Sequence, residues 1–283
     1  MTAKASPASP APAAAAAAQR PPEPPRGWSR QRVAGHALMA LWIAAALGLV
    51  LFLVRAYDPA LFSRFAPNYL SGLKITLSLV GLSVALGALL SAPIAYARTS
   101  SNRLLAWPAY AYVYFFRGTP LLAQAFLIYY GAGNFRPELE ALGLWVFFRD
   151  AWYCALFAFT LNTAAYQAEI LRGAVQAVPA GQWEGAASLG IPRGVALRKI
   201  ILPQALIVAL RPYGNEIILM IKGSAIVAII TVLDLMGETR RAYSRTFDFQ
   251  TYLWAAVIYL AVVEALRNII DWIERRITAH LKR

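Results

Sequence analysis

The stretch PAGQWEGAASLGIPRGVALRKIILP, from Pro179 to Pro203, is the longest weakly hydrophobic interval between two long apolar runs of this chain. Residues 182–189 have the composition of a short helix. Gly190 is placed to close that helix, because glycine tolerates the left-handed conformation of a C-terminal cap. Pro192 can then start a second helix, where its missing N–H costs nothing. A helix this short is unstable alone in water, so the stretch predicts a segment that docks against a partner.

The spacing of Glu184, Ala186, Gly190 and the run Ile200 to Pro203 resembles the EAA loop of bacterial ABC importer permeases. In that family the short helix is a coupling helix that sits in a cleft of the ATPase subunit. Gly185 stands where the first alanine is usual, which should loosen the helix by up to about 1 kcal/mol. The alternative is an amphipathic connector on the membrane surface. The docking residues that the resemblance implies are Gln182, Trp183, Glu184, Gly185, Ala186, Ala187, Ser188, Leu189 and Gly190.

Composition indicates a polytopic membrane protein. The chain is 59% hydrophobic and only 14% charged, and its mean hydropathy is +0.50. The net charge of +13 is spread between apolar runs rather than gathered in one patch, which argues against nucleic acid as a partner. The single cysteine, Cys154, excludes an intramolecular disulfide, and the distant His36 and His280 exclude a histidine metal site.

The chain divides into a tail and a membrane domain. Residues 1–35 are rich in Ala and Pro and are expected to form a disordered cytoplasmic tail, and residues 36–283 to form the permease domain. A cleaved signal peptide is the rival interpretation of the first apolar run, but no small-residue cleavage site follows it. Six membrane-spanning helices are predicted, at about 36–54, 69–96, 107–131, 151–171, 204–232 and 251–272.

Loop charges predict the orientation. Sixteen Lys and Arg residues lie on the side of both termini, in the two tails, the loop 97–106 and the central stretch, against seven on the other side. This bias places both termini and the central stretch in the cytoplasm. The resemblance to bacterial ABC importer permeases implies that the membrane is the inner membrane of a bacterial cell.

Catalytic machinery is not expected in this chain. The phosphate-binding pattern G-x-x-x-x-G-K-[ST] is absent, and two distant histidines cannot complete a Ser/His/Asp or Cys/His set. The chain is therefore predicted not to be an enzyme and to bind no cofactor, so that ATP and magnesium would be bound by a partner ATPase.

Polar residues inside the apolar runs are candidates for a substrate pathway. Asn162, Tyr166 and Glu169 are spaced to share one helical face. The alternative is hydrogen bonding between helices, with a Glu169–Arg172 pair near the cytoplasmic end.

The fifth predicted span carries Asn215 and Glu216 as further pathway candidates. Glu216 lies roughly 16 Å past Ala205 along a helix, close to the membrane midplane. A carboxylate there must find a cation, and the candidates are Arg211, Lys222 or the transported solute. An internal ion pair and a site for a cationic substrate both remain open.

The resemblance extends to the polar amino acid permeases within the ABC importers, through three further segments at 115–131, 164–182 and 202–227. Within that group, the motifs NTAAYQAEI and NEIILM are most similar to those of the M-type permeases. These permeases transport histidine, lysine, arginine, ornithine and opines such as octopine or nopaline. Many relatives have Thr-Ser-Leu where this chain has Gly223-Ser224-Ala225-Ile226, which limits how far their substrate contacts carry over.

The resemblance implies an all-α, type I ABC importer permease fold working by alternating access. It also implies two ATP-binding subunits, a second permease chain in a heterodimer rather than a homodimer, and a periplasmic solute-binding protein. The expected substrate is an amino acid, most of all a basic one. A glutamine- or glutamate-type permease is the alternative, and a secondary transporter or a non-transporting membrane scaffold are more distant rivals.

Overall fold

The computed structural model describes residues 29–55 and 57–279, and within these ranges every regular element is a helix. The chain forms two compact units that meet between Tyr57 and Asp58. The predicted disordered tail lies almost wholly outside the described residues.

The first unit contains one helix, α2 (Arg30–Arg55), which begins six residues before the predicted start of the first span. None of its residues is buried, and large apolar side chains such as Trp42 and Leu41 are exposed around it. A helix that is apolar on all sides and unburied is typical of one that faces lipid.

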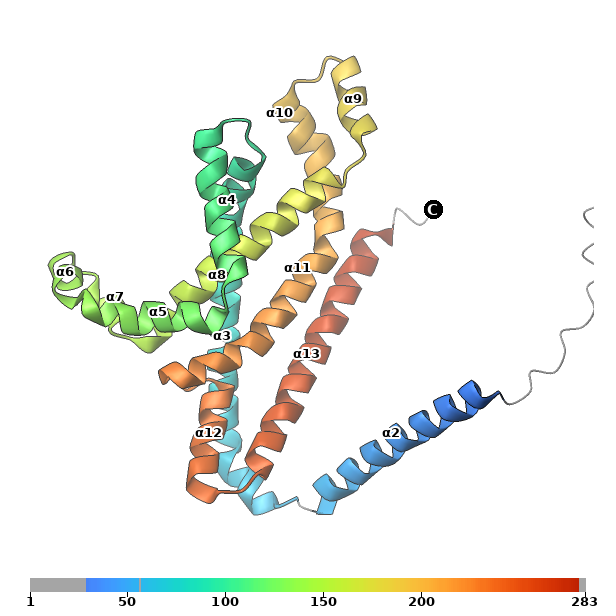
Figure 1. Ribbon diagram of the computed structural model, residues 1–283, viewed down its shortest axis with the longest axis vertical. Coiled ribbons are helices and arrows are strands. Elements are labelled where there is room, and N and C mark those ends of the chain that lie inside the picture. The colour runs from blue at the N-terminus through green and yellow to red at the C-terminus, as the bar shows by residue number, and fades with distance from the viewer. Residues whose placement is uncertain (1–28, 56, 280–283) are drawn as a thin grey trace, which may run out of the picture. The chain divides into compact units, whose positions relative to one another are not determined.

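The second unit is built around three helices that cross one another: α3 (Pro59–Thr99), α8 (Ala151–Gln176) and α11 (Leu202–Ser224) (Figure 1). Leu79 of α3, Phe159 of α8 and Ile221 of α11 meet in the main apolar core. Helix α8 is central to this core, and its side chains at Cys154, Ala155 and Ala158 are fully buried.

The third predicted span, 107–131, is not one helix. It is divided into α4 (Arg103–Gly118) and α5 (Leu121–Asn134), with Thr119 and Pro120 between them. Pro120 has an extended backbone at the N-cap of α5, and the residue before a proline is biased away from helical geometry. The sequence carried this signal within an otherwise apolar run.

Short helices connect the longer helices of the second unit, between α5 and α8 and between α8 and α11. The interval between the third and fourth predicted spans contains α6 (Arg136–Ala141) and α7 (Trp145–Phe148). The central stretch forms α9 (Ala180–Ser188), α10 (Arg193–Ala196) and a π-helical turn at Leu197–Ile201 that leads into α11. A 3₁₀ helix, Ala225–Ile230, follows α11, so the α-helical part of the fifth predicted span ends before residue 232.

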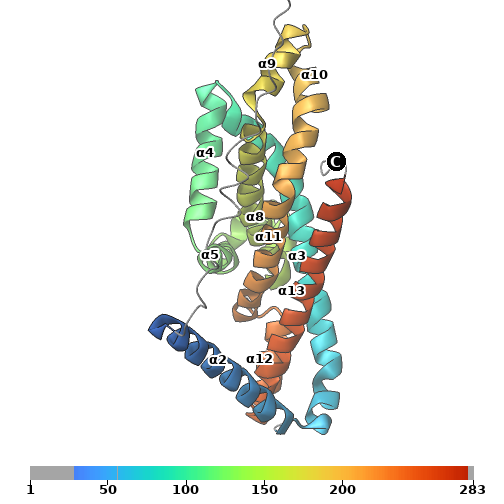
Figure 2. The same ribbon diagram turned by 90° about the vertical axis from the view of Figure 1, so that its right-hand side faces the viewer.

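The interval between the last two predicted spans is folded rather than a simple loop. Helix α12 (Leu235–Thr246) packs between α3 and α13 (Gln250–Ile277), at the end of the second unit opposite α9 and α10 (Figure 2). Asp234 caps α12 by accepting a 2.8 Å hydrogen bond from the Gly237 N–H, and Glu238 accepts one of 3.0 Å from Asn68 Nδ2. Both acidic residues are buried, although they lie between two predicted spans.

Four helical runs among the described residues are long and apolar enough to cross a membrane: Arg30–Arg55, Pro59–Thr99, Arg193–Ile230 and Gln250–Ile277. They overlap the first, second, fifth and sixth predicted spans. The other two predicted spans correspond to α4 with α5 and to α8, whose hydropathy is lowered by polar residues such as Asn162 and Gln167.

Gly72 provides a test of the α3–α12 contact. A Cβ atom added there would lie 2.7 Å from the Asp234 backbone oxygen and 2.9 Å from Leu235 Cα, so Gly72→Ala must displace backbone. We expect it to lower the free energy of unfolding by about 1–3 kcal/mol, as overpacking does. Gly81→Ala, in the same helix with nothing within 4 Å, should be neutral or stabilise by up to about 1 kcal/mol. Thermal unfolding in detergent measures both, and equal midpoints would contradict the close contact.

Candidate functional site

Helix α9 protrudes from one end of the second unit and is held there by few contacts. Trp183 packs on an apolar cluster formed by the end of α8 and the start of α11, including Val178 and Ile201. Ala186 is the buried residue of α9, and Trp183 is half-buried. The opposite surface, with Glu184 and the 79% exposed Leu189, is uncovered. The predicted short helix is therefore confirmed, with one anchored face and one free face.

Gly190 ends α9 as the sequence predicts. Its φ of +67° is left-handed, its N–H donates to the Ala187 carbonyl at 2.9 Å, and the Ile191 N–H donates to the Ala186 carbonyl at 3.0 Å. These two hydrogen bonds form a Schellman motif, which satisfies carbonyls that the helix end leaves free. Helix α10 begins directly after Pro192.

Substitution at this cap has a clear expected result. Gly190→Val places a β-branched residue at positive φ, which should cost more than the roughly 1–2 kcal/mol of an ordinary residue and should unfold the end of α9. Gly185→Ala is the matched control, because a Cβ there meets nothing within 4 Å and φ is not positive. Limited proteolysis around 180–192 should speed up for Gly190→Val alone. Equal cleavage rates would show that the cap does not hold the helix.

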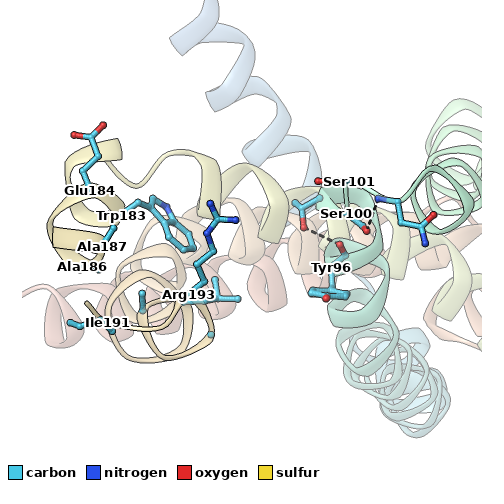
Figure 3. A pocket seen from close by; sticks show the side chains of 14 residues that line it. Tyr96, Ser100, Ser101, Trp183, Glu184, Ala186, Ala187, Ile191 and Arg193 are labelled. Atoms are coloured by element: carbon cyan, nitrogen blue, oxygen red, sulfur yellow. Dashed lines mark hydrogen bonds between the residues drawn. The ribbon is translucent and has the colours of Figure 1, made fainter. Parts of the chain in front are cut away.

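A groove of about 970 Å³ runs beside α9. Trp183 and Arg193 border it on one side, and Tyr96 and Ser100 of the α3–α4 turn border it on the other (Figure 3). Because this groove separates α9 from the α3–α4 turn, α9 contacts mainly α10 and the π-helical turn at Leu197–Ile201, and the apolar cluster around Trp183 connects it to the ends of α8 and α11.

The three candidate residues on α8 lie on one face, as predicted, and all three contact the end of α4. Asn162 Nδ2 donates to the Phe116 carbonyl at 3.0 Å, and the Arg117 guanidinium lies 5.1 Å from the Tyr166 ring centroid. Arg117 also lies 3.7 Å from the Glu169 carboxylate. The shared face of α8 therefore covers the point where α4 ends.

Asn162 stabilises the interruption between α4 and α5 through hydrogen bonds. It donates a second hydrogen bond, of 3.0 Å, to Gln124 Oε1, and Gln124 Nε2 in turn donates to the Phe116 and Thr119 carbonyls at 2.9 and 3.1 Å. Asn162 and Gln124 are 5% and 3% exposed. These contacts satisfy carbonyls freed by the helix break, and they give Asn162 a structural role.

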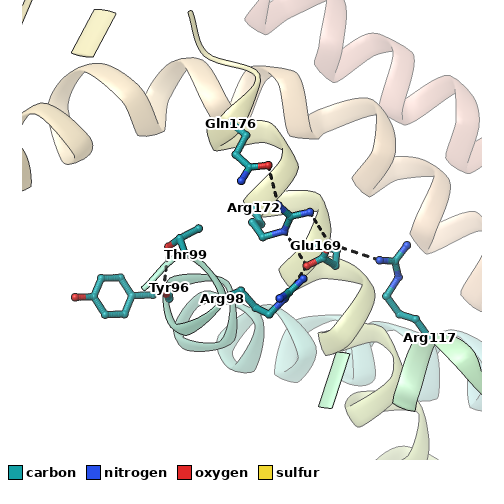
Figure 4. A network of polar contacts seen from close by, with 7 residues as sticks. All are labelled: Tyr96, Arg98, Thr99, Arg117, Glu169, Arg172 and Gln176. Carbon is teal, nitrogen blue, oxygen red and sulfur yellow. Dashed lines mark hydrogen bonds and ion pairs between the residues drawn. The ribbon is translucent and has the colours of Figure 1, made fainter. Parts of the chain in front are cut away.

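Glu169 joins a group of arginines near the end of α8. The Glu169–Arg172 pair expected from the sequence is present, with 2.8 Å between Arg172 Nη2 and Glu169 Oε2. Arg98 of α3 adds a contact of 3.1 Å from its Nε to Glu169 Oε1 (Figure 4). The alternative interpretation of Glu169, an interfacial ion pair, is confirmed and extended by Arg98 and Arg117.

Glu216 is buried between α11 and α8. It is 5% exposed, and its Oε1 accepts a 3.0 Å hydrogen bond from Thr163 Oγ1. Gln167 Nε2 donates to Thr163 Oγ1 at 3.0 Å, and the Tyr213 hydroxyl donates to Gln167 Oε1. Asn215, the neighbouring candidate, is exposed on α11 and is not brought into this network.

The two basic side chains expected as internal partners of Glu216 do not pair with it. Arg211 pairs instead with Glu274 of α13, with 2.7 Å between Arg211 Nε and Glu274 Oε1. Lys222 is exposed, and it makes no ion pair among the described residues. Among the described residues Glu216 makes no ion pair with a basic side chain, and Arg117 of α4 contributes a weaker attraction from a longer distance.

Sequence reasoning missed Thr163, Gln167, Gln124 and Arg117. Each is a polar residue inside an apolar run, which was the same signal that identified Asn162 and Glu216. Partners that identify them come from α8, α11 and α3, and lie 38, 53 and 83 residues away along the chain.

Comparison with known proteins identifies a family and several relatives with similar sequences. Residues 83–279 match the model of the binding-protein-dependent transport system inner membrane component family. The nopaline transport system permease protein NocM of Agrobacterium fabrum is 39% identical over 226 residues, which cover 80% of this chain and 94% of NocM. The arginine ABC transporter permease protein ArtM of Escherichia coli is 36% identical, over 78% of this chain and 99% of ArtM.

The fold agrees with the sequence match. A crystal structure of an amino acid ABC transporter with histidines superposes with a TM-score of 0.70 at 36% identity, over 78% of this chain and 99% of that one. The expectation of an all-α, type I ABC importer permease fold is thus confirmed, and the chain is a membrane-embedded permease. With a family model that spans its core helices and the protruding α9, the chain belongs to the binding-protein-dependent transport system inner membrane components.

Proposed function

We propose that this chain is the permease subunit of an ATP-driven importer that translocates a basic amino acid or an opine across the bacterial inner membrane. The observation that carries the substrate class is the buried carboxylate of Glu216, which neither Arg211 nor Lys222 neutralises. A buried carboxylate needs a cationic partner, and a positively charged solute passing between α8 and α11 would supply one. The named substrates of NocM and ArtM support this class.

Helix α9 would be the element that docks on an ATPase subunit. Its free face, at Glu184, Gly185, Ser188 and Leu189, is the surface offered to one of two ATP-binding subunits, which would themselves bind ATP and magnesium. This chain would hold no cofactor of its own. A second permease chain, forming a heterodimer, and a periplasmic solute-binding protein would complete the importer. Both termini would be cytoplasmic, because α9 needs access to the compartment that holds ATP.

The contacts of α9 suggest how its movement would reach the pathway. Closure of the ATPase pair would pull α9, and Trp183 would carry that displacement to α8 and α11 through their shared apolar cluster. These are the helices that Glu216 and Thr163 join near the middle of the membrane. A small tilt of one helix against the other would therefore change access to Glu216, as alternating access requires.

The alternative is a permease for glutamine- or glutamate-type polar amino acids. One observation favours it: Arg117 acts electrostatically on Glu216 and could balance its charge without a cationic solute.

Reconstitution tests the proposal. The chain would be assembled with its ATPase, second permease and binding protein in liposomes, and uptake of radiolabelled arginine, lysine and glutamine would be measured. We expect arginine or lysine uptake that requires ATP and the ATPase subunit. Uptake driven by an ion gradient without an ATPase would indicate a secondary transporter, and failure of the assembled complex to transport any solute would indicate a scaffold.

A further inference from the structure

Three arginines from three different helices surround one carboxylate near the end of α8. Arg98 of α3, Arg117 of α4 and Arg172 of α8 lie 3.1, 3.7 and 2.8 Å from Glu169 oxygens (Figure 4). We call these three residues the arginine cluster. Within ion-pair distance of Glu169, three positive charges face one negative charge, which leaves a local surplus of positive charge.

Hydrogen-bond donors are also in surplus. Arg172 is fully engaged, with Nε and Nη2 on Glu169 and Nη1 on Gln176. Arg98 uses its Nε alone for hydrogen bonding. Arg117 makes no hydrogen bond to any described residue; its contacts are the 3.7 Å ion pair with Glu169 and the Tyr166 ring, whose centroid lies 5.1 Å away. A guanidinium has five N–H donors in a planar fork that matches carboxylate and phosphate oxygens. Arg98 and Arg117 therefore hold donors available to an anion.

A cavity lies where those donors are available. Its volume is about 330 Å³, and its lining residues are Arg98, Tyr110, Val113, Tyr114, Arg117, Gly118 and Glu169. The Arg117 side chain is 43% exposed, compared with 17% for Arg98 and 26% for Arg172. The site is thus open to a ligand, and it is not a closed ion-pair network.

The wall of this cavity has the character of a membrane interface. Tyr110 and Tyr114, stacked at 6.0 Å between ring centroids, are 49% and 70% exposed, and Trp107 on the same helix is 71% exposed. The Arg98 guanidinium lies 4.9 Å from the Tyr110 ring centroid. Exposed Trp and Tyr rings on a helix that enters the membrane are typical of the headgroup level.

From these features we propose that the cavity between α3, α4 and α8 binds the phosphate of an anionic phospholipid headgroup, with Arg98 and Arg117 as its ligands. Basic pockets between membrane helices on the cytoplasmic side suit such headgroups. The tyrosines would lie against the glycerol and upper acyl chain, where an amphipathic ring is favoured. A free phosphate offers the same oxygens but would gain nothing from the exposed aromatic wall. The inference requires only a membrane location and is independent of the transported solute.

Lipid retention tests this assignment. The full chain, purified with its partner subunits, would be equilibrated with equal amounts of phosphatidylglycerol and phosphatidylcholine and analysed by native mass spectrometry. Preferential retention of phosphatidylglycerol is expected. Arg117→Gln should weaken that preference by about fivefold, the factor expected for one basic residue at an anionic surface. Arg117→Lys, which keeps the charge but loses the fork, should fall between the two.

Arg136→Gln provides the matched control. Arg136 is an exposed arginine of α6, paired with Glu140 at 2.7 Å, and its loss removes the same charge outside the cavity. Lipid retention in this variant should equal that of the unmodified protein. Equal retention of the two lipids by the unmodified protein, or an Arg136→Gln effect as large as that of Arg117→Gln, would overturn the assignment. Displacement of the lipid by inorganic phosphate alone would identify a soluble-anion site instead.

Discussion

Glu184→Lys is expected to abolish ATP-driven uptake while the protein still reaches the membrane. Glu184 is exposed, and its carboxylate lies at the outer edge of the groove beside α9 (Figure 3). Among the described residues its carboxylate makes no hydrogen bond or ion pair, and its backbone carbonyl accepts a 2.9 Å hydrogen bond from the Ser188 hydroxyl. The folded chain should therefore tolerate the change within about 0.5 kcal/mol.

The same substitution has a large expected effect on a docked ATPase. Reversing a charge inside a complementary interface places like charges together, which costs several kcal/mol. Each 1.4 kcal/mol is about a tenfold loss of affinity, so the ATPase should no longer be retained. Pull-down of the ATPase subunit and uptake by vesicles measure the two consequences.

Glu138→Lys is the matched control for this prediction. It makes the same charge reversal on α6, where Glu138 is exposed, and ATPase retention should not change. Normal uptake by Glu184→Lys would show that α9 is not the docking element and would favour a connector lying on the membrane.

Glu216→Gln is expected to reduce uptake of arginine or lysine by at least tenfold and to reduce uptake of a neutral amino acid much less. The amide keeps the shape of the side chain and can still accept the hydrogen bond from Thr163, which is 3.0 Å away in the parent protein. What it removes is the negative charge, and with it the attraction for a cationic solute in a poorly solvated site. Initial rates of uptake for labelled arginine and glutamine, measured side by side, give the ratio.

Thr163→Val separates charge from structure. It removes the hydrogen bond to Glu216 but retains the carboxylate, so it should slow both solutes to a similar extent. If Glu216→Gln also slows both solutes equally, Glu216 serves the internal network and its charge is balanced by Arg117. That result would leave the family assignment intact and favour the glutamine-type alternative.

Local sequence signals predicted α9 and its cap well. A glycine at positive φ and a proline after it act through their own backbone geometry, so Gly190 and Pro192 could be interpreted without any tertiary contact. The break at Thr119–Pro120 belongs to the same class, but the apolar residues on both sides concealed it. Hydropathy averages over a window and cannot register one extended residue.

Which charged side chains form ion pairs with one another could not be predicted from such local signals. Arg211 lies close in sequence to Glu216, so sequence spacing alone predicts an ion pair between them. In the structure, however, the Arg211 side chain pairs with Glu274 of α13. Likewise, Glu169 was expected to pair with Arg172, but its contacts with Arg98 and Arg117 depend on how α3 and α4 cross α8. Such pairings are set by helix crossing, which a single sequence does not encode locally.

The buried acids at the other end of the unit show a further limit. Asp234 and Glu238 belong to a segment whose composition is that of a loop, with a polar residue at most positions. They become buried because Gly72 lets α12 approach the backbone of α3. A glycine in an apolar helix has several possible reasons, and the close neighbour that explains this one lies more than 150 residues away in sequence.

The π-helical turn at Leu197–Ile201 sets the direction in which α10 and α9 point around the axis of α11. The Leu202 N–H donates to the Leu197 carbonyl, so this turn holds one residue more than an α-helical turn would. Deleting a single residue here would restore regular winding and swing α10, together with the attached α9, by about 100° around the axis of α11. Glu184 and Leu189 would then point in another direction with their helix intact. An ATPase that docks on α9, as proposed, would then have to approach this chain from a different side.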